Sequence, residues 1–153
     1  MSAGWIFAAF LLGSGAAAAS GAVFKPGSWY DGLKRPRWTP PGWVFPLVWT
    51  TLYILMAWAA TRVALRPENG AALALYAAQI ALNTLWTPVF FGARRIGLGA
   101  VVLLALLATV VTMIPAFWRV DWFAGLLLLP YGAWLCLASV LNLWIWRNNR
   151  SSA

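Results

Sequence analysis

Long apolar stretches alternate with short polar ones along this chain of 153 residues. A helix needs about 20 consecutive apolar residues to cross the hydrocarbon of a bilayer, because it rises only about 1.5 Å per residue. Five stretches reach that length, and they are separated by Lys, Arg, Pro or Gly. The predicted spans are residues 5–24, 43–65, 71–91, 96–117 and 122–146. The pattern therefore predicts an all-α fold, an integral membrane bundle of five transmembrane helices.

The links between these spans differ in length. Three of them are short, which favours antiparallel packing of successive helices in a single domain that covers residues 1–153. The first link, residues 25–42, is long enough to have a structure of its own. The opening span has no Lys or Arg before Lys25, whereas a cleaved secretory signal begins with positive charge. We expect this span to be retained.

The composition agrees with a membrane protein and excludes several kinds of chemistry. Apolar residues make up 63% of the chain and charged residues 9%, whereas an average soluble domain has about 25% charged residues. There is no His and one Cys, so an imidazole base, an internal disulfide and a Cys-rich zinc site are excluded. The three acidic residues are too scattered to indicate a carboxylate pair. We predict no catalytic residue, no metal site and no obligatory cofactor.

The chain has a net charge of +8, and its basic residues are distributed in a regular way. The basic residues lie between apolar spans rather than along one polar face, which favours membrane flanking over nucleic-acid binding. Eight of them lie in the first loop, the third loop and the C-terminal tail, and three lie on the opposite side. The positive-inside rule therefore predicts that the first loop and the C-terminus are cytoplasmic. The charge pattern leaves open whether a bacterial inner or outer membrane holds the protein.

Aromatic and amide residues recur at helical spacing in three of the spans. The three stripes are Phe45, Trp49, Tyr53 and Met56; Tyr76, Gln79, Asn83, Trp86 and Phe90; and Tyr131, Trp134, Ala138 and Asn142. A spacing of three to four residues places each stripe on one helix face, and amides at membrane depth should face inward to find partners. The stripes could line a cavity for a planar apolar ligand. Alternatively, they pack helices together, with the amides as interhelical links.

The first loop contains the stiff segment WYDGLKRPRWTPPGW, residues 29–43. Prolines restrict its backbone, whereas a merely solvated linker is rich in Gly and Ser. We expect Asp31 to anchor the loop by pairing with a basic neighbour, and the remaining cations to be available to a carboxylate. The segment therefore indicates a cationic lid over the bundle, suited to an amphipathic planar acid.

Four ordered segments of the chain resemble the TspO/MBR family. They are WYDGLKRPRWTPP, LVWTTLYILMAWA, ALNTLWTPVFFG and LPYGAWLCLASVLNLW. This family contains the bacterial tryptophan-rich sensory proteins and the mitochondrial translocator protein, and the chain is most similar to its alpha-proteobacterial branch. The resemblance implies a homodimer of five-helix subunits, each with a pocket closed by the first loop. Small-residue helix faces, Gly13, Ala17 and Gly21 or Ala74, Ala78 and Ala81, could form the dimer contact.

The resemblance also implies the ligands and the residues that bind them. Family members bind protoporphyrin IX, haem and related porphyrins, benzodiazepine-type ligands and, in some cases, cholesterol. Carried over residue by residue, the ligand-binding positions are Tyr30, Trp38, Pro40, Trp49, Tyr53, Asn83, Trp86, Trp134 and Ala138. The six of these positions that lie in predicted spans coincide with the stripes and favour the cavity interpretation. Sterol binding is doubtful, because Leu143 stands where the family's sterol segment has a tyrosine.

Three functions are compatible with such a cavity. The leading interpretation is a membrane sensor or regulator that binds tetrapyrroles. A porphyrin transporter is the second, although the predicted helices offer no carboxylate for ion coupling. The third is light-dependent porphyrin degradation, for which the family implicates the tryptophans matching Trp49 and Trp134. That photochemistry needs no acid or base residue.

Overall fold

A computed structural model describes residues 2–23 and 27–150, and the described residues form helices and loops without a strand. The elements are α1 (Ala3–Val23), α2 (Ser28–Asp31), α3 (Val44–Ala64), α4 (Gly70–Thr87), the π-helix η1 (Pro88–Gly92), α5 (Ile96–Val120), α6 (Trp122–Leu127) and α7 (Leu129–Asn148). Five stretches are long and apolar enough to cross a membrane: Ala3–Gly21, Val44–Ala64, Gly70–Gly92, Ile96–Val120 and Trp122–Asn148. The predicted bundle of five membrane helices is confirmed.

Prolines explain where the helices depart from the predicted ranges. The fifth predicted span is broken at Leu128, because the ring of Pro130 clashes with the carbonyl four residues earlier and has no N–H to donate. At Pro88 the same loss of an N–H coincides with a change from α-helix to the π-helix η1. The fourth span instead continues through Pro115 and ends at Val120, beyond the predicted residue 117.

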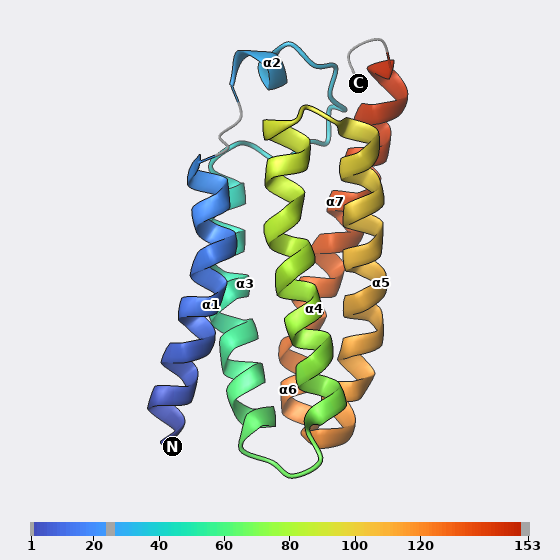
Figure 1. Cartoon of the computed structure of the whole chain (residues 1–153). Helices are drawn as coiled ribbons and strands as arrows, with labels where there is room; N and C mark the ends of the chain where they lie inside the picture. Colours follow the sequence, from blue (N-terminus) through green and yellow to red (C-terminus); the bar gives the residue numbers. More distant parts are fainter. Residues whose placement is uncertain (1, 24–26, 151–153) are drawn as a thin grey trace.

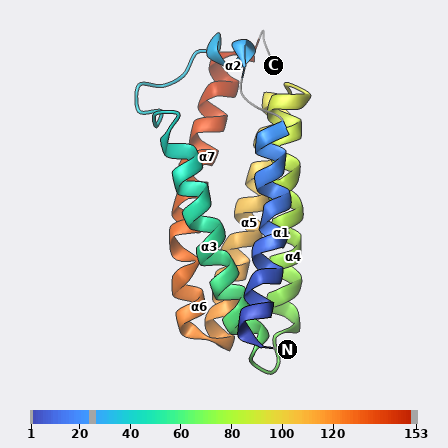
Figure 2. The same cartoon turned by 90° about the vertical axis from the view of Figure 1, so that its left-hand side faces the viewer.

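The membrane helices form a closed ring (Figures 1 and 2). α1 packs against α3 and α4, α4 packs against α5, and α5 packs against α7. α6 contacts both α3 and α5 and so closes the ring. Figure 1 shows α2, the α4–α5 turn and the end of α7 at one end of the bundle, and the start of α1 and the α3–α4 turn at the other. We call the first of these the lid end.

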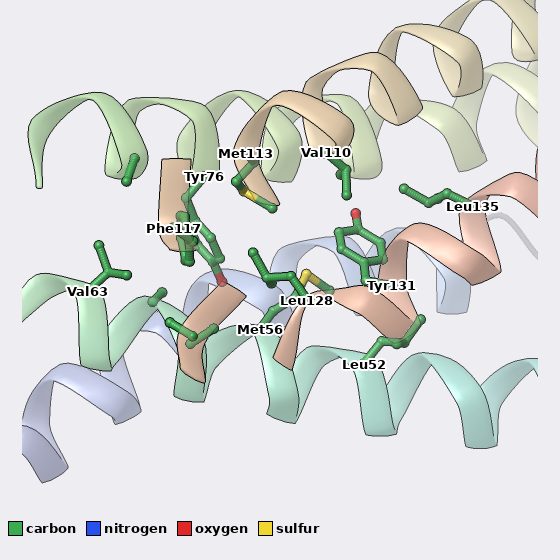
Figure 3. Close-up of a cluster of buried hydrophobic side chains, with 14 of the residues drawn as sticks. Leu52, Met56, Val63, Tyr76, Val110, Met113, Phe117, Leu128, Tyr131 and Leu135 are labelled. Atoms are coloured by element: carbon green, nitrogen blue, oxygen red, sulfur yellow. The ribbon is translucent and has the colours of Figure 1, made fainter. Parts of the chain in front are cut away.

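A solid core fills the half of the bundle away from the lid end (Figure 3). Met56, Val63, Val110, Met113 and Phe117 have no exposed surface there, and they come from α3 and α5. Lipid tails are as apolar as these side chains, so close packing rather than removal from water holds this core together. The outer surface is also apolar, as expected for helices that face lipid.

The far end of the bundle is fixed by a buried carboxylate. Asp121 lies between α5 and α6, and its Oδ1 accepts hydrogen bonds from the backbone N–H groups of Phe123 at 3.0 Å and Ala124 at 3.2 Å. Its Oδ2 lies 3.1 Å from Nε of Arg62 and 3.6 Å from Nη2 of Arg66, at the end of α3. Burial alone would raise the pKa of Asp121, but the hydrogen bonds and the charge of Arg62 outweigh it and lower the pKa.

Candidate functional site

The lid-end half of the bundle encloses a cavity of about 600 Å³. Its walls come from α1, the first loop, α3, α4, η1, α5 and α7, so it lies inside the ring of helices. The volume is in the range of about 300–1,000 Å³ that is typical of small-molecule sites. Eight of the nine predicted ligand positions line it: Tyr30, Pro40, Trp49, Tyr53, Asn83, Trp86, Trp134 and Ala138.

Trp38 is the predicted position that does not line the cavity. Its side chain is 45% exposed. The loop turns back just before it, because the N–H of Thr39 bonds to the carbonyl of Pro36 at 3.2 Å and the Thr39 hydroxyl bonds to the same carbonyl at 2.6 Å. The structure therefore brings Tyr30 and Pro40 to the cavity from this loop, and leaves Trp38 outside it.

Aromatic rings from α3 and α7 meet at the cavity. On α3 the rings of Trp49 and Tyr53 lie 5.5 Å apart and are tilted by 32°. Phe45 of α3 meets Trp134 of α7 edge to face at 5.6 Å. Flat, weakly polar faces of this kind suit a ligand that is itself flat and aromatic.

The amide of Asn142 fixes the wall formed by α4 and η1. The indole Nε1–H of Trp86 donates to Oδ1 of Asn142 at 3.1 Å, and Nδ2 of Asn142 donates to the carbonyl of Ile96 at 3.1 Å. Trp86 in turn stacks on Phe90 at 5.0 Å. One amide on α7 therefore ties together the end of α4 and the start of α5, and it sets the orientation of an indole that lines the cavity.

A second polar chain separates the cavity from the solid core. The hydroxyl of Tyr53 donates to Oδ1 of Asn83 at 3.4 Å, and Nδ2 of Asn83 donates to the hydroxyl of Tyr131 at 2.9 Å. That hydroxyl donates to Oε1 of Gln79 at 2.7 Å. Gln79 and Tyr131 do not line the cavity. Some members of the stripes therefore line the cavity, and others link helices.

Trp134 presents an unused hydrogen-bond donor. Its Nε1 is buried and has no acceptor among the described residues. A buried donor without a partner costs free energy. Because Trp134 lines the cavity, an acceptor atom of a ligand is a suitable partner for this group.

The first loop is held by an amide rather than by the predicted ion pair of Asp31. Asp31 forms no ion pair within the described ranges. Instead, the backbone N–H of Lys34 donates to Oδ1 of Asn149 at 2.8 Å, and Nδ2 of Asn149 donates to the Lys34 carbonyl at 2.9 Å. Leu33 is buried beside them against Phe90 and Ile145. Asn149 was not among the predicted residues, because its position in a polar tail offered no signal.

Comparison with known proteins places this architecture in a family. The sequence model of the TspO/MBR family matches residues 5–147. The chain is 49% identical to Protein CrtK of Rhodobacter capsulatus over 94% of this chain and 92% of that protein. It is 50% identical to the tryptophan-rich sensory protein of Cereibacter sphaeroides over 90% and 87% of the two chains. It is 40% identical to the human translocator protein over 79% and 75%. The chain belongs to the TspO/MBR family and is an integral membrane protein.

Proposed function

We propose that this protein is a membrane sensor that binds protoporphyrin IX, haem and related porphyrins in the lid-end cavity. The observation that carries the proposal is the convergence of Trp49, Trp86 and Trp134 on one cavity of about 600 Å³. Stacking on flat aromatic ligands is the interaction that such indoles provide. The relative from Cereibacter sphaeroides is named a tryptophan-rich sensory protein, which supports the sensory role.

The cavity lining suits the porphyrin ring more than a bound metal. The lining residues that the structure describes contain no imidazole, thiol or thioether, and therefore lack the usual nitrogen and sulfur ligands of haem iron. Ring stacking and apolar contact would then supply most of the affinity, and metal-free protoporphyrin should bind as well as haem. Benzodiazepine-type ligands would place their aromatic rings against the same aromatic faces.

Binding, rather than transport, is favoured by the solid core. Met56, Met113 and Phe117 have no exposed surface and belong to the buried apolar cluster drawn in Figure 3, so packed side chains occupy the part of the bundle away from the lid end. Proteoliposomes tested for porphyrin flux separate the two functions. Binding without flux supports the sensor, and flux above protein-free vesicles supports a transporter.

One observation favours light-dependent porphyrin degradation as a second function. The indoles of Trp49 and Trp134 both line the cavity, where electron-rich rings would lie against an excited porphyrin. The test compares the loss of porphyrin absorbance under light with wild-type protein and with Trp134→Phe. Equal rates for the two proteins count against degradation by this route.

A homodimer and a cytoplasmic first loop remain part of the proposal. Ala74, Ala78 and Ala81 are exposed on one face of α4, whereas Ala17 and Gly21 line the cavity. The α4 face is therefore the better candidate for a dimer contact. The basic residues gathered at the lid end support a cytoplasmic location for that end.

Tryptophan fluorescence provides the direct binding test. Titration of the purified protein with protoporphyrin IX should quench its fluorescence with a Kd near the micromolar range, about −8 kcal/mol. Trp134→Phe and Trp49→Phe should each remove part of the quenching, because these indoles lie at the cavity. Trp5→Phe is the matched control, since Trp5 is 72% exposed and does not line the cavity. Absence of quenching, or equal quenching in all three variants, would contradict the proposal.

A further inference from the structure

One charged side chain lines the cavity in the part of the chain that the structure describes. Arg35 comes from the first loop, and the other lining residues are apolar, aromatic, or neutral and polar. The guanidinium carbon of Arg35 lies 4.7 Å from the ring centroid of Tyr30, which also lines the cavity. This cation–π contact keeps the guanidinium at the lid end of an otherwise uncharged space.

Among the described residues, Arg35 has no counter-charge. The ion pairs between described residues join Asp121 to Arg62 and Arg66 at the far end of the bundle. The described residues that line the cavity include no acidic side chain. The planar guanidinium presents parallel N–H donors that match the two oxygens of a carboxylate, so the missing partner is an anion of that shape.

The backbone on both sides of Arg35 is constrained. Lys34 is held through its N–H and its carbonyl by Asn149. Pro36 follows directly, and a residue that precedes proline is restricted to extended conformations. The backbone position of Arg35 is therefore set before a ligand arrives, which reduces the conformational entropy lost on binding.

We propose that Arg35 determines specificity by pairing with a carboxylate arm of an amphipathic aromatic acid whose ring system occupies the cavity. This inference rests on the proposed porphyrin site and deepens it. The acid arm lies at the lid end, close to water, and the apolar rings lie between α3, α4 and α7. The reverse orientation would bury a carboxylate without a cation, which is costly.

The test uses two probes that share one ring system: metal-free protoporphyrin IX and its dimethyl ester, in which both carboxylates are replaced by neutral methyl esters. Wild-type protein should bind the acid about tenfold more tightly than the ester, because a charge-assisted hydrogen bond contributes about that factor. Arg35→Gln should weaken binding of the acid about tenfold and leave binding of the ester unchanged. Arg35→Lys keeps the charge but not the paired donors, and it should give an intermediate result. Arg37→Gln is the matched control, since Arg37 is on the same loop and does not line the cavity.

The outcomes separate this inference from the function on which it rests. If the wild-type protein binds both probes and Arg35→Gln leaves the preference for the acid intact, the inference is overturned and the porphyrin site stands. If Arg35→Gln weakens both probes equally, Arg35 has only a structural role, which also overturns it. If the wild-type protein binds neither probe, the porphyrin site itself is refuted. The salt dependence of acid binding, present in the wild type and reduced in Arg35→Gln, is an independent readout.

Discussion

The side-chain amide of Asn149 pairs with both backbone groups of Lys34, at 2.8 and 2.9 Å, across 115 positions of the sequence. Asn149 is buried, and its Nδ2 also donates to the carbonyl of Ile145 at 2.8 Å. The residue that follows α7 thus holds the middle of the first loop through a pair of hydrogen bonds to one backbone position. These hydrogen bonds attach the loop to the bundle, whereas an ion pair of Asp31 was predicted to do so.

Asn149→Ala should loosen the first loop. The loss of two partly buried hydrogen bonds is expected to cost about 1–3 kcal/mol. Amide hydrogen exchange of residues 27–42 should become faster, while exchange in the core of α5 stays unchanged. Asn148→Ala is the matched control, because the exposed Asn148 bonds only to the carbonyl of Trp144 on its own helix. Equal exchange in the two variants would show that Asn149 does not hold the loop.

Tyr131→Phe should destabilise the bundle without filling or enlarging the cavity. The variant leaves Oε1 of the fully buried Gln79 without its donor and Nδ2 of Asn83 without its acceptor. Unpaired buried groups of this kind cost about 1–3 kcal/mol. The Tm in detergent should fall, whereas Tyr30→Phe should keep the wild-type Tm, because no described group hydrogen-bonds to its hydroxyl. A Tm equal to that of the wild type would contradict the role of the polar chain.

Acid should weaken the far end of the bundle through Asp121. The pKa of its carboxyl is lower in the folded protein than the ordinary value of 3.8. Its pairing with Arg62 and Arg66 therefore stabilises the fold fully above that value, and the stabilisation is lost as the pH falls through the lower folded-state pKa. The Tm measured between pH 6 and about pH 2 should decline below pH 4 in the wild type.

Two amide variants check this assignment. Asp121→Asn should have a lower Tm at neutral pH and a smaller decline in acid, since the charge is already absent. Asp31→Asn should keep the wild-type profile, because Asp31 forms no ion pair with described residues. A wild-type acid profile in Asp121→Asn would assign the decline to other groups.

Much of the fold follows from counting apolar residues. Span length is set by the bilayer, so five stretches of about 20 residues were enough to predict five membrane helices. The places where individual helices are interrupted were harder to predict from the sequence. The interruption at Leu128 and the π-helix at Pro88 depend on where a proline falls in the hydrogen-bond ladder, which hydropathy averages over.

The cavity walls were predictable because helical periodicity brings Trp49, Tyr53 and Asn83 to inward faces, and the family resemblance named the same positions. Periodicity alone could not divide a stripe between cavity and core. Tyr131 and Trp134 are three residues apart, yet only Trp134 lines the cavity. The attachment of the first loop could not be predicted from the sequence, because it depends on contact between one side-chain amide and a backbone segment far away in sequence.

The central claim is that a ligand occupies the space between the aromatic faces, and Ala138 offers the most direct measurement of it. Ala138 lines the cavity on α7, whereas Ala133 is exposed on the same helix. Ala138→Phe should fill part of the space and lower the affinity for protoporphyrin IX at least tenfold, measured by fluorescence titration, while Ala133→Phe keeps the wild-type Kd. Comparable Tm values would establish that both variants are folded. Unchanged affinity in folded Ala138→Phe would mean that porphyrin binds elsewhere or not at all, and would contradict the account.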